Sequence, residues 1–332
     1  MKFSIVIVTY NRINLLRRAI DSALNQTLPC EVIVVDDCSS DDTQAYVQNR
    51  RNDRLQAGDT RLIYHRNSSN RGHSASVNAG IAVATGDWIK LVDDDDYLAA
   101  NCIEEMAKAI ALCPSVVICS CQAIQVDANE VEISRTRQVG LEKVSYIPQQ
   151  DIHYGMLLEL VPFGTPIQVA FSRAAFLKSG GWDSSLDANF DDIDSWIKIA
   201  QFGDAVFINQ CLAYRTHWSG AYNQMLSLQK RLETNLLIKK KIYALVSDKY
   251  RDNLPKLEEI EAYIKLHWSL VALKKRKLLY AANLAFPAMM YPVAWQLLWQ
   301  RVRGTVFPKS PSLDTATIPH DLRMQVSSRS NP

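Results

Sequence analysis

The stretch WIKLVDDDDYL, residues 88–98, runs from an apolar segment directly into four consecutive carboxylates, Asp93 to Asp96. Like charges this close repel one another, and a carboxylate at the end of a buried strand is costly unless a positive group meets it. Two interpretations are open at this point. Either the four acids form a solvated loop, or they hold a cation.

The segments around this stretch alternate between strand-like and helix-like patterns. Apolar, β-branched runs are typical of buried strands, and stretches with apolar residues at helical spacing separate them. We expect strands at 3–10, 31–37, 61–65, 87–92 and 115–124, and helices at 14–27, 41–50, 74–86 and 99–112. This alternation predicts an α/β fold, in which a mixed, mostly parallel sheet is covered by helices on both faces.

The acids of the opening stretch are not alone at the end of a predicted strand. Asp36 and Asp37 follow the second strand, as Asp93–Asp96 follow the fourth. In sheets of this kind, ligands bind in the crevice at the carboxyl ends of the strands. The coincidence favours the cation over the solvated loop.

Carboxylates at a strand end are suited to a hard divalent cation. Mg²⁺ and Mn²⁺ are held by one or two carboxylates together with phosphate oxygens. Because side chains alternate along an extended chain, we expect Asp93 and Asp95 to face one site and Asp94 to turn away. We expect Asp96 to cap the helix that follows.

The order and spacing of four segments resemble those of family 2 glycosyltransferases, over residues 3–220. The segments are SIVIVTYNR, EVIVVDDCSSDDT, NRGHSASVNAGIAVATGDWIKLVDDDD and GGWDSSLDANFDDIDSWIKIA. The resemblance implies a GT-A fold, with a nucleotide-sugar half at about 1–125 and an acceptor half at about 126–220. It also implies an inverting transfer of a sugar from a nucleotide-diphosphate sugar, by family habit a UDP-sugar, to an acceptor hydroxyl.

The resemblance assigns the nucleotide side of the site residue by residue. It places the donor nucleotide against Thr9, Tyr10, Asp37, Asn78 and Asp93. It makes Asp95 the metal ligand of the Asp-x-Asp pair, while Asp93 reaches the ribose or the waters on the metal. A divalent cation on both phosphates stabilises the charge of the departing nucleotide diphosphate.

The acceptor side follows from the segment DDIDSW, residues 191–196. By resemblance Asp192 is the catalytic base, although Asp191 stands where the family more often has Glu, so the choice between these neighbours stays open. Both acids also suit the start of the helix that runs through this segment. His217 stands where relatives carry a His that reaches the metal or the diphosphate, although a lone His is often only a polar loop residue. Trp182 is either a wall on the acceptor side or a core residue.

Two other functions remain open from the sequence. One is a catalytically silent module that binds a sugar nucleotide or a partner. The other is a sugar nucleotidyltransferase, which also uses Asp with Mg²⁺. Enzymes of that kind open with a Gly-rich, basic loop after the first strand, whereas here that strand ends in TYNRINLL, without Gly.

The last third of the chain differs from the rest in charge. From residue 221 onward, 18 Lys and Arg stand against 8 Asp and Glu, although the whole chain carries a net charge of only +2. We expect a basic helical extension at 221–307 and a disordered, Pro- and Ser-rich tail at 308–332. Such a surface suits an anionic partner. We expect no nucleic-acid partner.

An uncharged run of 23 residues lies between Lys277 and Arg301. It is long enough to span a bilayer, but Pro287 and Pro292 interrupt it and basic clusters flank it on both sides. Three interpretations are open for 273–303: an interfacial helix, a packed soluble helix, or a membrane span. The first allows a peripheral membrane contact and suits a saccharide or lipid-linked acceptor.

The remaining composition indicates a folded protein. Hydrophobic residues make up 48% and charged residues 22% of the chain, which is ordinary for globular domains and excludes a disordered class. The seven cysteines show no CxxC pair and no framework spacing, so we interpret them as reduced thiols. The N-terminus is interpreted as a strand and not a signal peptide. We therefore expect a cytoplasmic protein, at the inner face of the cell membrane if the surface contact exists.

Overall fold

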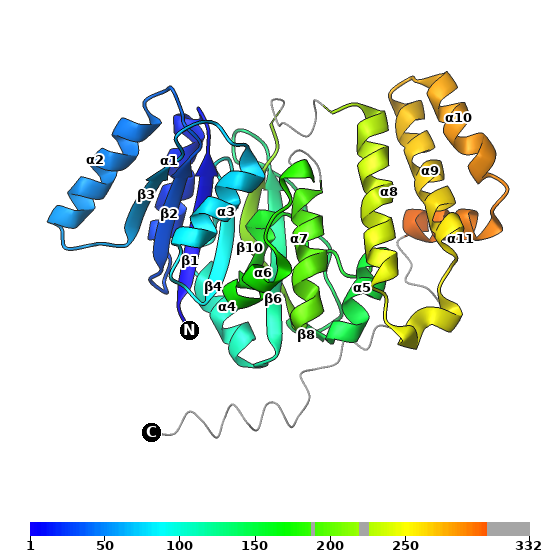
Figure 1. Ribbon diagram of the computed structural model, residues 1–332, viewed down its shortest axis with the longest axis horizontal. Helices are drawn as coiled ribbons and strands as arrows, with labels where there is room; N and C mark the ends of the chain where they lie inside the picture. The colour runs from blue at the N-terminus through cyan, green and yellow to red at the C-terminus, as the bar shows by residue number, and fades with distance from the viewer. Residues whose placement is uncertain (187–189, 219–225, 304–332) are drawn as a thin grey trace.

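The computed structural model describes residues 1–186, 190–218 and 226–303. A ten-stranded mixed sheet forms its centre (Figure 1), in the order β3-β2-β1-β4-β9-β6-β10-β5, with β7 paired to β6 and β8 to β10. The strands are β1 Phe3–Thr9, β2 Glu31–Asp36, β3 Leu62–Arg66, β4 Trp88–Asp93, β5 Tyr97–Leu98, β6 Val116–Val126, β7 Glu132–Arg135, β8 Val144–Ile147, β9 Val169–Ser172 and β10 Asp204–Thr216.

Helices cover both faces of this sheet, and the C-terminal helices pack beyond one end of it. They are α1 Ile13–Leu24, α2 Thr43–Gln56, α3 His73–Val83, α4 Cys102–Ala111, α5 Gln149–Leu157, α6 Arg173–Ser179, α7 Asp191–Ile199, α8 Leu228–Ala244, α9 Leu257–Lys274, α10 Leu278–Ala288 and α11 Pro292–Arg303. Short 3₁₀ helices lie at Pro166–Gln168, Ser184–Leu186, Ala200–Phe202 and Asp248–Asn253. The predicted α/β class is confirmed.

Two parallel blocks of the sheet are joined by an antiparallel strand, and β5, β7 and β8 add antiparallel pairs to β6 and β10. Strands β3, β2, β1 and β4 run parallel, and β6 and β10 are parallel to each other. Strand β9 lies between β4 and β6 and is antiparallel to both. The parallel block places the carboxyl ends of β1, β2 and β4 at one edge, where the acids predicted from the sequence lie.

Alternate side chains of the central strands feed two separate cores. On β1, Ile5 and Ile7 pack with α1, α2 and α4, whereas Val6 on the opposite face packs with α3 and the later helices. Helix α3 approaches the sheet closely at Gly80. A Cβ there would lie 2.5 Å from a Val6 methyl group and 2.8 Å from a Val35 methyl group.

A fully buried lysine ties β4 to the segment before β9. Lys90 Nζ donates hydrogen bonds to four backbone carbonyl oxygens, those of Leu91, Pro166, Ile167 and Val169. Burial lowers the pKa of Lys90. A buried ammonium is tolerated where such acceptors replace water.

The C-terminal helices share a core with the sheet. Helix α8 packs against α5 and α7, and α9 packs against α8, α10 and α11. One hydrophobic core runs from Val6 in β1 through Trp196 in α7 to Leu298 in α11. The predicted boundary at residue 220 and the predicted tail at 308–332 both lie outside the described residues. The three-part division of the chain therefore stays a prediction.

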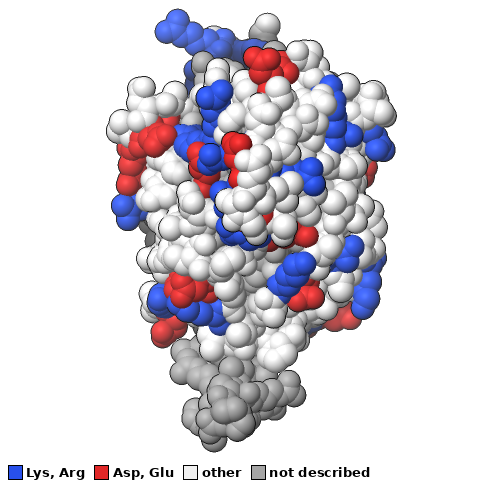
Figure 2. Space-filling view, turned by 90° about the vertical axis from the view of Figure 1, so that its left-hand side faces the viewer, with Lys and Arg blue, Asp and Glu red and all other residues white. Residues whose placement is uncertain are grey.

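The segment 273–303, interpreted from the sequence as an interfacial helix, a packed helix or a membrane span, is not one continuous helix. Residues 278–303 form two helices, α10 and α11, because Pro292 has no N–H to continue the first helix and instead begins the second. Within the described residues, no helix is both long and apolar enough to cross a membrane. The opposite end of the molecule, beside α2, carries acidic and basic side chains intermixed (Figure 2).

Candidate functional site

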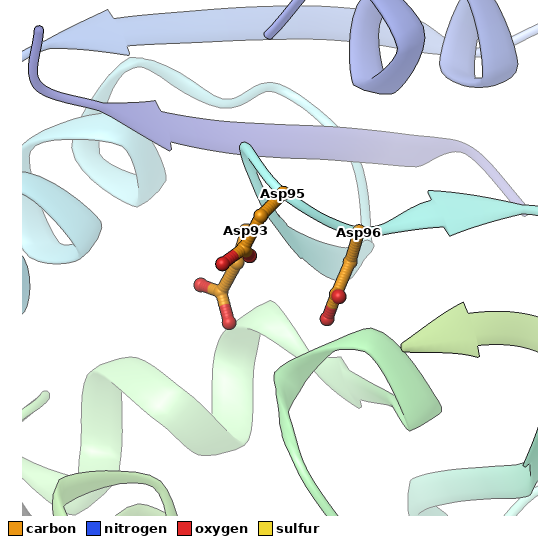
Figure 3. A group of neighbouring side chains, drawn as sticks. All are labelled: Asp93, Asp95 and Asp96. Atoms are coloured by element: carbon orange, nitrogen blue, oxygen red, sulfur yellow. The ribbon is translucent and has the colours of Figure 1, made fainter. Parts of the chain in front are cut away.

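Three carboxylates gather where β4 ends. Oxygen atoms of Asp93, Asp95 and Asp96 all lie within 4.8 Å of one another. Figure 3 shows Asp93 and Asp95 side by side, with Asp96 further along the loop toward β5 and all three carboxylates directed to the same side. The predicted pairing of Asp93 with Asp95 agrees with this geometry.

Asp94 turns away from this cluster, as side-chain alternation predicts. Its carboxylate accepts hydrogen bonds from Thr9 Oγ1 at 2.8 Å and from an Arg12 guanidinium nitrogen at 2.9 Å. Burial raises the pKa of Asp94 to about 7 against the opposing charge of Arg12. Asp94 therefore fixes the loop to β1.

The expectation that Asp96 caps a helix is wrong. Strand β5 intervenes, and α4 begins only at Cys102 with Asn101 as its N-cap residue. The Asp96 carboxylate instead accepts the backbone N–H of Thr216, the last residue of β10, at 2.8 Å. The pairing of β5 with β10 thus turns Asp96 toward the acidic cluster.

The donor set of the cluster fits a hard divalent cation. Burial, followed by the neighbouring carboxylates, raises the pKa of both Asp95 and Asp96. One guanidinium nitrogen of Arg12 lies 3.5 Å from Asp95, and Trp218 Nε1 donates to Asp95 at 2.9 Å. Three buried or half-buried carboxylates facing one point are oxygen ligands of the kind that Mg²⁺ and Mn²⁺ prefer.

His73 connects this cluster to the start of α7. Its Nε2 lies 3.2 Å from Asp93 Oδ1, and its Nδ1 lies 3.3 Å from Asp191 Oδ2. Burial lowers the pKa of His73, but the hydrogen bonds to Asp191 and Asp93 outweigh it and raise the pKa well above its ordinary value. In the protonated imidazole both ring nitrogens donate, one to each carboxylate. His73 thus connects the two acidic segments of the sequence.

The residue proposed as base lies next to this bridge. Asp192 is the second residue of α7, and the N–H of Ile193 donates to its carboxylate at 2.7 Å. Burial and then the charge of Asp191 raise the pKa of Asp192 to about 7. Phe190, just before these acids, has a left-handed backbone with φ of 64°.

Two predicted nucleotide residues hold backbone in place. Both Asp37 oxygens accept backbone N–H groups at the start of α3, from Arg71 and Gly72, and Asn67 Nδ2 donates to Asp37 at 2.7 Å. The Asn78 side chain on α3 forms two hydrogen bonds of 3.0 Å with the backbone of Trp182. Asp37 and Asn78 thus position the segments on either side of His73.

The other predicted residues differ in their surroundings. Tyr10 is 45% exposed beyond β1, whereas Trp182 is buried, with its ring centroid 5.3 Å from that of His73. His217 follows β10, and its buried Nε2 has no hydrogen-bond partner among the described residues. The ring nitrogens of His217 do not belong to the cluster of three carboxylates.

Three site residues escaped the sequence analysis: Arg12, His73 and Trp218. Arg12 and Trp218 both approach Asp95 Oδ2, and the Arg12 guanidinium lies 5.2 Å from the centroid of the Trp218 ring. The motif NRGHSAS contains His73, but its partners Asp93 and Asp191 are 20 and 118 residues away in the chain. The only signal in the sequence was that a His stands within this motif.

Comparison with known proteins decides the family. The model described as Glycosyl transferase family 2 matches residues 4–180, more than half of the chain. The chain belongs to this family. The predicted resemblance is therefore confirmed.

Family 2 relatives with curated names come from several bacteria. The GalNAc(5)-diNAcBac-PP-undecaprenol beta-1,3-glucosyltransferase of Campylobacter jejuni is 35% identical over 153 residues, which cover 45% of this chain and 47% of that protein. The poly(ribitol-phosphate) beta-N-acetylglucosaminyltransferase TarS of Staphylococcus aureus is 32% identical over 113 residues, 33% of this chain and 19% of that protein. The chain matches less than half the length of these relatives.

Solved structures with a similar fold agree with the predicted GT-A architecture. The S. aureus TarS fragment 1–349 in complex with UDP superposes with a TM-score of 0.57 at 17% identity, over 92% of this chain and 93% of that chain. The mannosyltransferase PcManGT from Pyrobaculum calidifontis, in complex with GDP-Man and Mn²⁺, gives a TM-score of 0.55 at 19% identity, over 99% and 86%. At such identities the likeness shows the fold.

Proposed function

We propose that this family 2 protein is an inverting, metal-dependent glycosyltransferase that moves a sugar from a UDP-sugar to a hydroxyl of a lipid-linked or cell-surface saccharide. The names of the C. jejuni and S. aureus relatives, a glucosyltransferase on an undecaprenol-linked glycan and a poly(ribitol-phosphate) transferase, support the acceptor class. The titles of the TarS complexes support UDP as the nucleotide.

One observation carries this proposal. His73 joins Asp93 of the carboxylate cluster to Asp191 beside Asp192, with contacts of 3.2 and 3.3 Å. A cation site and a carboxylate base next to each other are the two groups that direct displacement of a nucleotide diphosphate requires. A binding module has no need for the second group.

On the donor side, Asp95 and Asp93 are proposed to hold Mg²⁺ or Mn²⁺, with His217 directed to the metal or the diphosphate. A bound divalent cation stabilises the negative charge of the departing nucleotide diphosphate. Asp96 completes the cluster of oxygen ligands, and Arg12 supplies a fixed positive charge beside Asp95. These side chains are held in place before the donor binds, so that oriented protein groups take the place of water.

The nucleotide itself is proposed to lie between β1 and α3. Thr9 is the last residue of β1 and Tyr10 follows it, while Asp37 and Asn78 fix the turn and the helix on the other side. Thr9 acts partly through Asp94, since its hydroxyl is bound to that carboxylate. The exposed Tyr10 ring is available for a base to stack on.

On the acceptor side, Asp192 is proposed to take the proton of the attacking hydroxyl. A pKa of about 7 keeps this carboxylate a competent base at neutral pH. Asp191, held by His73 and by Ser74 Oγ at 3.3 Å, positions the start of α7. Attack from the face opposite the leaving group inverts the anomeric centre, and Trp182 lies beside this region.

A first experiment measures UDP release from UDP-glucose, UDP-galactose, UDP-N-acetylglucosamine and UDP-N-acetylgalactosamine by the full chain with Mn²⁺. We expect release from at least one donor and its loss with EDTA. Asp192→Asn should bind UDP as tightly as the native chain. Its rate of UDP formation from the UDP-sugar should be at least about 100-fold lower, since general base catalysis contributes about 10²–10⁴-fold. The fully exposed Asp248 offers a matched control, Asp248→Asn. Undiminished release by Asp192→Asn would refute the assignment of the base.

A further inference from the structure

Helix α10 exposes three large apolar residues, Leu278, Leu279 and Phe286, while Tyr280 and Leu284 pack against the core. Leu279 is 85%, Phe286 82% and Met290, just past its end, 81% exposed. The face toward the core carries Ala281 and Ala288, which are 2% and 1% exposed. A helix that packs onto its own protein normally keeps such large apolar residues on its buried face.

The exposed apolar residues form one face. At 100° per residue, Leu278, Leu279 and Phe286 fall within about one third of the circumference of α10. No residue of α10 is charged. The half-exposed rings of Trp295 and Trp299 on α11 add two amphipathic side chains of the kind that membrane interfaces favour. Figure 1 shows α10 at the outer end of the molecule.

Positive charge lies at the start of this apolar face. The acid Glu233 of α8 acts on Tyr280, a partly buried residue of α10 outside this face, whose pKa is raised by burial and then by Glu233. The basic run Lys274–Lys277 comprises the last residue of α9 and the turn before α10. Its four side chains are exposed and form no ion pair with a described residue. From residue 262 to residue 303 the sequence has seven Lys and Arg and no Asp or Glu. A partner for this face therefore carries negative charge beside apolar groups.

We propose that the exposed face of α10, with Trp295, Trp299 and the basic run Lys274–Lys277, docks the protein on a bilayer that contains anionic lipid. The apolar side chains enter the boundary between headgroups and acyl chains, while the basic run meets lipid phosphates. A second copy of the chain is a poorer occupant, because it would bring the same excess of positive charge. The docking does not depend on sugar transfer, so its failure would leave the proposed reaction standing.

The test is flotation of the full chain with two kinds of vesicle, phosphatidylcholine alone and phosphatidylcholine with phosphatidylglycerol. We expect binding to the anionic vesicles only, and weaker binding at 0.5 M salt than at 0.1 M salt. Lys274→Gln/Lys275→Gln should weaken binding roughly 30-fold, since each basic residue near an anionic surface contributes roughly fivefold. Leu279→Gln/Phe286→Gln should weaken it at least about 10-fold.

A matched control lies at the opposite end of the molecule (Figures 1 and 2). Arg51→Gln/Leu55→Gln removes one exposed basic and one exposed apolar residue from α2 and should bind as the native chain does. Equal binding by all variants, or no binding of the native chain to anionic vesicles, would overturn the proposal. So would a native dimer in analytical ultracentrifugation that Leu279→Gln/Phe286→Gln converts to monomer, because the face would then be an interface between two copies.

Discussion

Replacing His73 by Phe tests whether the two acidic segments act as one site. The Phe ring keeps the shape of the side chain and its edge contact with Trp182, but it loses both hydrogen bonds, to Asp93 and to Asp191. Asp93 and Asp191 then carry charge without their shared donor. The peptide backbone at the start of α3 is unaffected, so the change is confined to the site.

The size of the effect follows from the contacts. A hydrogen bond to a charged group contributes about 1.5–3 kcal/mol. The side chains of His73 and Asp93 are 37% and 32% exposed, so water replaces part of what is lost. We therefore expect a total loss of about 1–3 kcal/mol of transition-state stabilisation, which corresponds to a fall of roughly 5–150-fold in kcat/KM.

The assay is initial-rate UDP release over a range of Mn²⁺ concentrations. His73→Phe should lower kcat/KM and raise the Mn²⁺ concentration for half-maximal rate, because a residue that orients a ligand carboxylate affects metal affinity about 10–100-fold. His65→Phe on the edge strand β3 is the matched control. If His73→Phe kept native kcat/KM and native Mn²⁺ dependence, the reasoning that joins the two segments would fail.

Three further predictions concern pH, a buried charge and a turn. Because the base acts deprotonated and its pKa is raised to about 7, kcat/KM should fall about tenfold per unit as pH drops below about 7 and level off above it; a profile flat down to pH 5 would contradict the role of Asp192. Lys90→Met leaves four buried carbonyl groups without their donor and should lower the free energy of unfolding by about 1–3 kcal/mol, measured by urea titration; an unchanged midpoint and slope would contradict it. Gly180 and Gly181 both have positive φ, 85° and 78°, but only at Gly181 would a Cβ meet Asn78 Oδ1, at 2.8 Å. Gly180→Ala should therefore cost about 1 kcal/mol in the same titration and Gly181→Ala distinctly more, with a loss of UDP release in the second variant alone; equal costs would count against a tight contact with Asn78.

The parallel half of the fold could be predicted because its signals are local. Each of the early strands is a short apolar run followed by polar residues, and parallel strands bring their carboxyl ends to one edge. Asp93 and Asp95 could thus be placed together from the sequence. That Asp94 turns away from this pair also followed from the alternation of side chains, but its hydrogen bond to Thr9 of β1 did not.

Other parts of the site depend on contacts between distant segments. Asp96 was misassigned because the two-residue strand β5 has no pattern of its own and exists only through pairing with β10. His73 gave only a weak signal, its place in the motif NRGHSAS, because its partners come from β4 and α7. Likewise, β9 is four residues long, and nothing in its sequence indicates that it lies between β4 and β6.

The continuous core from β1 to α11 has a consequence for engineering. Because Trp196 and Leu298 belong to the same apolar cluster, the C-terminal helices are not a detachable module. Exchanging them with those of another family member would require matching surfaces on α5 and α7 to be transplanted as well. Recombination between such proteins should tolerate crossovers in surface loops of the sheet far better than a cut before α8.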